Sequence, residues 1–197
     1  ACVLHYRADA APVRDGELVL IDAGCELDGY ASDITRTFPA NGKFTGPQRD
    51  LYNLVLASQD AAVAATKAGA RFVDPHDATV KVLAQGLLDL GLLNKTKHGT
   101  VQDVIEKRAY FPFYMHRTSH WLGMDVHDCG SYVEPSELGQ TSERKDPLSG
   151  ETIVNRPSRI LREGMVLTIE PGLYVRPADD VPEAFWNIGI RIEDDAI

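Results

Sequence analysis

Two kinds of hydrophobic pattern follow one another along this chain, and their order restricts its fold more than any other feature. Apolar runs typical of β-strands come first, apolar residues at helical spacing follow, and strand-like runs return near the end. The predicted strands are residues 17–24, 30–38, 165–175 and 186–193. The predicted helices are residues 47–69, 75–91 and 101–109. Strands that precede and follow a group of helices in this way predict an α+β domain.

Turn residues between these patterns support the same assignment. Asp28-Gly29 lies between the first two strand-like runs, which are therefore predicted to form a β-hairpin. Pro47 suits the first turn of a helix, and Gly69 is a plausible residue for its end. Residues 134–158 are polar and contain several prolines and glycines, which predicts a long loop.

The composition excludes several classes of protein. With 197 residues, of which 44% are hydrophobic, the chain is long enough for one substantial core. Its formal net charge of −9 and its lack of a large basic block argue against a nucleic-acid partner. No apolar run approaches the roughly 18 residues needed to span a bilayer. No basic and apolar leader is present either, so no membrane partner is expected.

Three widely spaced cysteines, Cys2, Cys25 and Cys129, do not suggest a disulfide framework. We expect all three to be small packing residues in a reducing compartment, and the protein to be cytoplasmic. Both ends of the chain read as strands without a stop signal. Residues 1–197 are therefore expected to be one domain that is incomplete at both ends, within a longer polypeptide.

Two aspartates stand in or beside apolar strands, where a lone charge is costly to bury. Asp22 ends the first strand-like run, and Asp33 lies on the second. If the turn between them has an even number of residues, both side chains project from the same face of the hairpin, opposite or diagonal to one another. Two like charges this close repel unless a proton or a cation lies between them.

Two glutamates occupy similar settings near the other end of the chain. Glu170 follows an apolar run, and Pro171 favours extended backbone at Glu170. Along residues 188–193, alternation places the isoleucines on one face and Arg191 and Glu193 on the other. Each of the four carboxylates taken alone could face solvent at a strand end, but together they indicate one shared site.

A shared site of four buried carboxylates requires cations to keep them ionised. Two divalent ions, with a total charge of +4, would balance four negative charges. Ligands that are mostly oxygen favour hard or borderline ions such as manganese, cobalt, magnesium or zinc.

Residues 116–128 contain His116, His120 and His127, which are half of the six histidines in the chain. A lone histidine is usually structural, but this density indicates metal binding or proton transfer. The spacing of His116 and His120 is also that of a helical zinc site, although Arg117 stands where such a site has glutamate. A single-zinc protease is therefore one alternative.

Five blocks of sequence contain these candidate residues. They are Ile21-Asp22-Ala23-Gly24, Ser32-Asp33-Ile34-Thr35-Arg36-Thr37-Phe38, His116-Arg117-Thr118-Ser119-His120-Trp121-Leu122-Gly123-Met124-Asp125-Val126-His127-Asp128, Ile169-Glu170-Pro171-Gly172-Leu173-Tyr174 and Gly189-Ile190-Arg191-Ile192-Glu193-Asp194. In this order, they resemble the conserved blocks of the aminopeptidase P family of proline-specific metallopeptidases. The resemblance covers nearly the whole chain.

This resemblance implies the pita-bread fold, a curved mixed sheet covered by helices, of which the chain would be a part. Residues 1–197 would be the metallopeptidase catalytic domain, without the family's N-terminal creatinase-like domain. Residues 134–158 look longer than the corresponding segment of the family, which affects the expected rim of the pocket.

The same resemblance implies a ligand set for two divalent ions. Asp33 and Glu193 would bridge the ions, Asp22 would complete the set of one ion, and His120 and Glu170 would complete that of the other. The implied metal is manganese, with cobalt or zinc as alternatives.

The resemblance further implies roles around the substrate. His5, His116 and His127 match histidines of the family that surround the substrate. Arg191 matches a supporting arginine close to the metals, and Tyr174 matches a position at the substrate pocket.

The implied reaction is hydrolysis of the peptide bond between an N-terminal residue and a following proline. We expect a hydroxide that bridges both ions to attack the carbonyl carbon before proline. His127 or His116 would help one metal to stabilise the oxyanion, and Glu170 would carry a proton to the proline nitrogen. The partners would be peptides with proline at the second position, and the full-length protein is expected to be a homo-oligomer.

Other functions on the same scaffold differ in testable ways. A prolidase would share the fold and ligands but cut only Xaa-Pro dipeptides, and His116 and Trp121 favour the aminopeptidase. A metal-free binding protein would have lost ligands, whereas all five matching positions are present here. A serine hydrolase built on Ser119 lacks a nucleophile elbow.

Overall fold

The computed structural model describes residues 2–4 and 11–197. The strands are β1 (Leu18–Ala23), β2 (Glu26–Leu27), β3 (Tyr30–Ala31), β4 (Ile34–Pro39), β5 (Ser142–Lys145), β6 (Thr152–Asn155), β7 (Leu167–Ile169), β8 (Gly172–Val175), β9 (Ile188–Arg191) and β10 (Asp194–Ala196). The helices are α1 (Gly46–Ala65), α2 (Asp74–Asp89), α3 (Lys95–His98) and α4 (Val101–Glu106), with short 3-10 helices η1 (Pro135–Glu137) and η2 (Glu183–Phe185).

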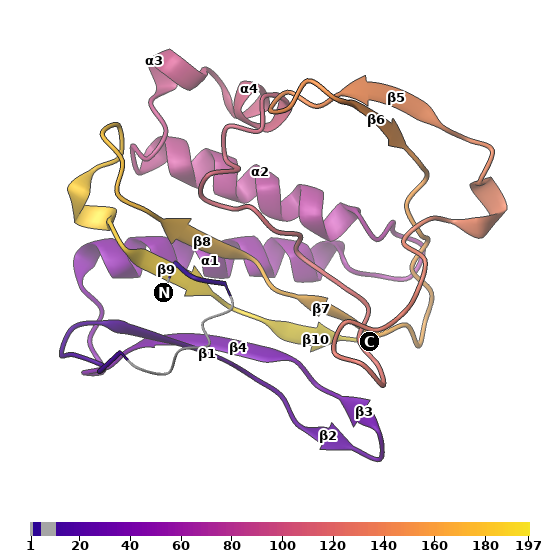
Figure 1. Ribbon diagram of the computed structural model, residues 1–197, viewed down its shortest axis with the longest axis horizontal. Coiled ribbons are helices and arrows are strands. Elements are labelled where there is room, and N and C mark those ends of the chain that lie inside the picture. Colours follow the sequence, from indigo (N-terminus) through magenta and orange to yellow (C-terminus); the bar gives the residue numbers. More distant parts are fainter. Residues whose placement is uncertain (1, 5–10) are drawn as a thin grey trace.

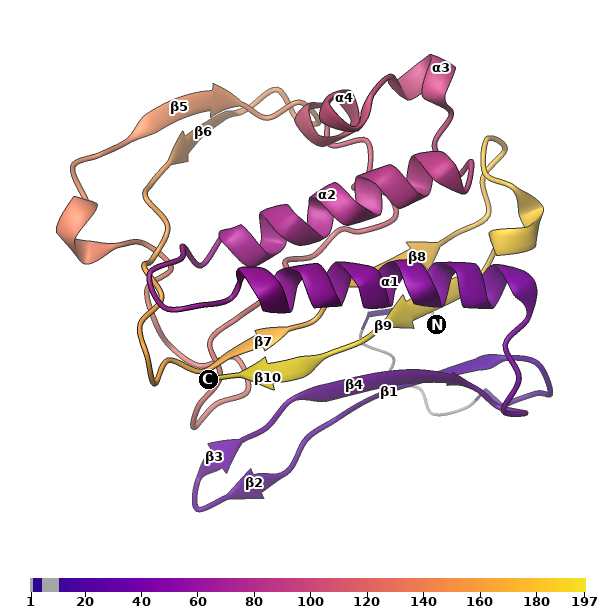
Figure 2. The ribbon, with the colours of Figure 1, turned by 180° about the vertical axis from the view of Figure 1, so that it is seen from behind.

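Strands from the two ends of the chain lie side by side, and helix α1 packs across one face of them with α2 against it (Figures 1 and 2). The core between these layers combines apolar residues of both helices with alternate residues of β8 and β9. This arrangement confirms the predicted α+β class.

The first hairpin is formed by β1 and β4, as predicted, and the short pair β2–β3 carries it to its turn. Asp22 lies opposite Thr35 in this register. Asp33 is two residues before Thr35, so it lies on the same face as Asp22 and diagonal to it. The hairpin thus brings the two aspartates together in one of the two predicted ways.

The strands near the end of the chain form a second antiparallel pair, β7–β8 with β9–β10. Gly172 pairs with Arg191 on one side of Pro171, and Ile169 pairs with Asp194 on the other side. Because the register is the same on both sides, Glu170 lies opposite Glu193.

Side chains alternate along this second pair as the sequence predicts. Ile188, Ile190 and Ile192 belong to the hydrophobic core. Arg191 instead donates to Asp22 and Thr35, on the face away from the helices.

Residues 118–122 form a further extended segment beside β7. The Thr168 amide donates to the His120 carbonyl at 3.0 Å, and the Glu170 amide donates to the Thr118 carbonyl at 2.7 Å. On the other side, the Glu193 amide donates to the Thr35 carbonyl at 3.1 Å. Together with the strand pairings, these bonds place β1, β4, β9–β10, β7–β8 and residues 118–122 side by side in that order.

Helix α1 begins at a capping box, in which Thr45 and Gln48 each accept the other's backbone amide. It ends at Ala65 rather than at the predicted residue 69. The backbone leaves helical geometry at Thr66, while Gly69 takes a positive φ of +87° in the connection and donates its amide to the Leu161 carbonyl. Gly69 therefore serves the following turn and not the helix end.

Helix α2 lies close to its predicted bounds and packs tightly on α1. A Cβ atom added at Gly86 would lie 2.2 Å from Cδ1 of Leu54, so a larger residue there would displace the Leu54 side chain. The predicted third helix is shorter than expected and corresponds to α4. It stops before Arg108, which has a positive φ of +53°. Helix α3 was not predicted.

Residues 134–158 are not the irregular loop that was predicted. They contain η1 and a hairpin of β5 and β6, which lies beyond α2 and α4 (Figure 1). Asp146, near the turn of this hairpin, accepts a hydrogen bond from Arg108 at 2.6 Å. The two strands are mostly exposed, so neither carries the alternation of apolar residues from which strands are predicted.

Cys2 is half-buried, whereas Cys25 and Cys129 are exposed. The prediction that all three cysteines are packing residues is therefore wrong for the latter two. Over residues 2–4 and 11–197, no helix is both long and apolar enough to cross a membrane.

Candidate metal centre

Neighbouring extended segments each bring one predicted metal ligand to the same region. The ligands and their positions are Asp22 in β1, Asp33 just before β4, Glu193 between β9 and β10, Glu170 just after β7, and His120 in residues 118–122. The backbone hydrogen bonds between these segments hold the five residues in adjacent positions.

His120 has the orientation of a metal ligand. Its Nδ1 lies 2.9 Å from the carbonyl oxygen of Trp121, and because a carbonyl only accepts, Nδ1 carries a proton. In the neutral ring, Nε2 then presents a lone pair, which faces Asp33 Oδ2 at 3.4 Å and Glu170 Oε1 at 3.6 Å. Three electron-rich atoms that face one another favour a cation between them. A backbone carbonyl on the opposite nitrogen is a usual support of a metal-binding histidine.

The donor set fits a divalent metal ion. Ligand atoms of Asp33, His120 and Glu193 all lie within 4.8 Å of one another, and all three residues are buried. Metal–ligand bonds of about 2.1 Å place neighbouring ligand atoms about 3 to 3.5 Å apart, close to the separations around His120 Nε2. Glu193 Oε1 is buried and has no hydrogen-bond partner within the described part of the chain. Such an oxygen is costly to bury, and a bound cation would offset this cost.

Burial makes three of the carboxyl groups hard to ionise. Burial and the charge of Glu193 raise the pKa of Glu170 to about 9. Burial also raises the pKa of Glu193 to about 7, although the hydrogen bond from Thr35 opposes this shift. Burial, and then the hydrogen bond and charge of Asp22, raise the pKa of Asp33 to about 6. Protons therefore compete with metal ions for this site.

Arg191 connects the carboxylates to the rest of the site. It is 5% exposed, and it donates to Asp22 Oδ2 at 2.6 Å and to Thr35 Oγ1 at 3.1 Å. The Thr35 hydroxyl in turn donates to Glu193 Oε2 at 2.6 Å. Thr35 was not among the predicted site residues. The strand alternation that places it on the same face as Asp33 was the signal for it.

Asp195 was also missed in the sequence. Its Oδ2 accepts the amide of Asp33 at 3.2 Å, and its Oδ1 is buried without a hydrogen-bond partner among the residues described. Burial raises the pKa of this carboxyl group. Continuing the alternation of Arg191 and Glu193 by two residues would have placed Asp195 on the same face.

The predicted substrate-side residues are only partly brought together. His116 Nε2 lies 2.9 Å from the hydroxyl of Tyr174, and Tyr174 lies 3.4 Å from Nη1 of Arg191. His127 is exposed, and its ring centroid lies 4.2 Å from that of His120. His5 lies outside the described residues.

The alternative of a helical zinc pair is wrong. The chain around His116 and His120 is not helical. Nδ1 of His116 lies 2.7 Å from the Arg117 carbonyl and its Nε2 meets Tyr174, so both ring nitrogens have partners other than a shared ion with His120.

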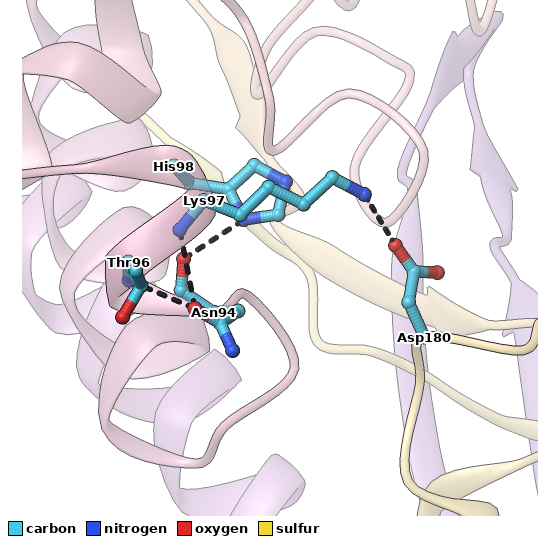
Figure 3. A pocket seen from close by; sticks show the side chains of 5 residues that line it. All are labelled: Asn94, Thr96, Lys97, His98 and Asp180. Atoms are coloured by element: carbon cyan, nitrogen blue, oxygen red, sulfur yellow. Dashed lines mark hydrogen bonds and ion pairs between the residues drawn. The ribbon is translucent and has the colours of Figure 1, made fainter.

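A shallow hollow elsewhere on the molecule is lined by Asn94, Thr96, Lys97, His98 and Asp180 (Figure 3). Lys97 and Asp180 form an exposed ion pair across it at 2.8 Å. None of the predicted site residues that the structure describes lines this hollow, so it is separate from the candidate metal centre.

Comparison with known proteins identifies the family of this chain. The sequence model of metallopeptidase family M24 matches residues 1–197. The chain belongs to this family. The M24 chain is 47% identical to the Xaa-Pro aminopeptidase of Haemophilus influenzae over 197 residues, which are 100% of this chain and 40% of that relative. It spans less than half the length of the curated relatives it matches.

Solved structures show the same fold. Aminopeptidase PepP of Pseudomonas aeruginosa superposes with a TM-score of 0.83 at 46% identity, over 98% of this M24 chain and 39% of that chain. A variant of Escherichia coli aminopeptidase P in complex with substrate gives a TM-score of 0.82 at 47% identity, over 98% of this chain and 38% of that one. These neighbours confirm the pita-bread fold, and their length is consistent with a partial domain here.

Proposed function

We propose that this chain is the metal-binding catalytic part of a dinuclear aminopeptidase that removes an N-terminal residue preceding proline. The observation that carries the proposal is the meeting of His120 Nε2 with Asp33 and Glu170 beside the unpaired Oε1 of Glu193. Membership of family M24 and the likeness to proteins named Xaa-Pro aminopeptidase support the reaction class.

The positions of the side chains support the proposed ligand roles. Asp33 lies diagonal to Asp22 across the hairpin on one side, and its Oδ2 lies 3.4 Å from Nε2 of His120 on the other. This middle position suits a carboxylate that bridges two ions, and Glu193 opposite Glu170 suits the second bridge. Asp22 would complete the set of one ion, and its Oδ2 is oriented by Arg191. His120 and Glu170 would complete the other set. Manganese is our proposed metal because the donors are mostly oxygen.

Two divalent ions bound here would lower the pKa of a water molecule between them and polarise the carbonyl before proline. The chain's own groups would then position the substrate and move protons. The Glu170 carboxyl group can hold a proton and pass it to the proline nitrogen. His127, whose ring lies beside that of His120, would donate to the oxyanion. His116 and Tyr174 hold one another at the substrate side.

The choice of proline has a simple physical basis. An amide nitrogen that belongs to proline carries no hydrogen, so a site for it needs no acceptor at that position. The same scaffold could in principle cut only Xaa-Pro dipeptides, as a prolidase does. The length of the accepted peptide separates these two activities.

Hydrolysis by the full-length, manganese-loaded protein tests this proposal. Three substrates are compared: an Xaa-Pro-Xaa tripeptide, the same tripeptide with alanine instead of proline, and an Xaa-Pro dipeptide. We expect release of the first residue from the proline tripeptide, no release from the alanine tripeptide, and loss of the activity in Glu193→Gln. Cleavage of the dipeptide alone would indicate a prolidase, and no cleavage of any substrate would contradict the proposal.

A further inference from the structure

Three polar side chains outside the ligand set meet at one point, and two of them are fully buried. The hydroxyl of Thr118 lies 2.6 Å from the hydroxyl of Tyr114 and 3.0 Å from Nδ1 of His76 in helix α2. Thr118 and Tyr114 are both fully buried. A hydroxyl can donate to one of these groups and accept from the other, so Thr118 satisfies both of its neighbours at once.

The backbone of Thr118 connects this hydrogen-bond network to the metal centre. Its carbonyl accepts a hydrogen bond from the backbone amide of Glu170 at 2.7 Å. This bond joins residues 118–122 directly to the candidate ligand that follows β7. Two residues further along, the same segment carries His120. Thr118 therefore ties two candidate ligands of one ion to helix α2.

The network also reaches the substrate side. The ring of Tyr114 packs edge-on against the ring of His116, with centroids 4.9 Å apart. His116 in turn meets the hydroxyl of Tyr174. A shift of Tyr114 would thus be transmitted to His116 as well as to Thr118.

His76 acts in this network as a neutral hydrogen-bond partner. Burial, reinforced by the positive charges of Arg117 and other neighbouring basic groups, lowers the pKa of His76 to about 3. The ring therefore stays uncharged near neutral pH, and its contribution is the geometry of one hydrogen bond.

We propose that Thr118 is a positioning residue of the metal centre, whose hydroxyl, held by Tyr114 and His76, fixes the carbonyl that supports Glu170. The inference rests on the proposed function, since it assigns Glu170 and His120 to one ion. Replacement by valine keeps the size of the side chain but removes its hydroxyl. The buried groups of Tyr114 and His76 then lose their partner, and the segment that holds Glu170 is released from α2.

Metal binding to the full-length protein tests this role. In Thr118→Val, we expect the dissociation constant for manganese to rise and kcat to fall, each by about 10- to 100-fold, as for other groups that orient metal ligands. KM should change little, because Thr118 acts through Glu170 rather than through the substrate. Thr118→Ser keeps a hydroxyl and should restore most of the affinity.

Thr79→Val provides a matched control. Thr79 is also a fully buried threonine, on the same helix as His76, but its hydroxyl has no hydrogen-bond partner within the described residues. Its removal should leave the manganese affinity and kcat at the wild-type level. Should Thr118→Val fail to fold, Tyr114→Phe removes one partner of the Thr118 hydroxyl and takes its place in the test.

Amide hydrogen exchange separates this inference from the proposed function, because it needs no metal. In the metal-free protein, the Glu170 amide should exchange faster in Thr118→Val than in the wild type and in Thr79→Val. Unchanged exchange at Glu170, or faster exchange with unchanged manganese affinity, would overturn the positioning role. Wild-type protein that binds no manganese and cuts no proline peptide would refute the proposed function and with it the catalytic role of Thr118, whatever the exchange result.

Discussion

Asp33 lies among several other polar groups of the site, and its replacement isolates the role of one charge. Its carboxylate faces His120, it lies diagonal to Asp22 across the hairpin, and its backbone amide donates to Asp195 Oδ2. Asp33→Asn keeps the shape but removes the negative charge proposed to lie between two ions. We expect weaker binding of both ions and loss of activity.

The fold should tolerate this change well. Removing a charge close to Asp22 relieves repulsion in the metal-free protein, so its melting temperature should be unchanged or higher. Elemental analysis and thermal unfolding check both expectations. Two retained ions with unchanged activity in Asp33→Asn would disprove the bridging role.

His116 and His127 are proposed to act on the substrate and not as ligands. Truncation of either to alanine should leave the metal content unchanged while turnover falls by a factor of roughly 100 to 10,000 through lost proton transfer or electrostatic help. Metal analysis and hydrolysis of an Xaa-Pro tripeptide, measured on the same preparations, test this. Loss of metal from His116→Ala would show that it is a ligand, and full activity in both variants would show that the two histidines are only structural.

At the level of residues, the sequence located the acids, the histidines and Arg191, but not the threonines and Asp195 that support them. Asp22, Asp33, Glu170 and Glu193 were found because a carboxylate in an apolar strand is unusual. Thr35 shares a strand face with Asp33, but a threonine in a strand is common and does not by itself indicate a site. Thr118 has no signal in the sequence. Their roles depend on hydrogen bonds to residues far away in the chain, which only the folded structure shows.

Among the elements, the segment of residues 134–158 is the one whose local stability can be tested apart from the site. Glu134 is 2% exposed and its carboxylate accepts from the Ile160 amide, from Ser136 and from Arg162. These bonds lower the pKa of Glu134 to about 2. In Glu134→Gln, the charge-assisted bonds become weaker, at a cost of about 1 to 3 kcal/mol.

The effect of Glu134→Gln should be local. Amide exchange over residues 135–157 should become faster, while manganese stoichiometry stays the same, since Glu134 is not a predicted ligand. Hydrogen exchange with mass spectrometry measures the first quantity and elemental analysis the second. Unchanged exchange in this segment would show that Glu134 does not hold it.

The elements that were predicted well carry strong periodicity. Helix α2 buries regular apolar positions, so its pattern is visible locally. The hairpin of β1 and β4 was recognised from an apolar run followed by the turn residues Asp28-Gly29. The hairpin of β5 and β6 and helix α3 are largely exposed and polar. They are held by contacts such as Arg108 with Asp146, which link residues distant in the chain and leave no local pattern.

For the whole molecule, the raised pKa values predict how stability depends on pH. In the metal-free protein, the pKa of Glu170 is about 9 and that of Glu193 about 7, above their ordinary value of 4.5. Between pH 4.5 and the raised pKa of each group, the folded state holds a proton that the unfolded chain has released. The contribution of these two carboxyl groups to the free energy of unfolding is therefore complete below pH 4.5 and is lost as the pH rises toward 9.

Thermal unfolding of the metal-free protein at several pH values between 5 and 9 tests this dependence. The melting temperature of the wild type should fall with pH more steeply than that of Glu170→Gln, which has no carboxyl group to ionise. With saturating manganese the trend should reverse, because ions bind the ionised carboxylates of the folded state. Parallel curves for the wild type and Glu170→Gln would contradict the raised pKa of Glu170.

Anomalous diffraction from crystals of the manganese-loaded, full-length protein tests directly whether the five ligands bind two ions. We expect two manganese peaks, both in contact with Asp33 and Glu193, one also with Asp22 and the other with His120 and Glu170. A single peak, or peaks that none of these five residues contacts, would contradict the dinuclear centre.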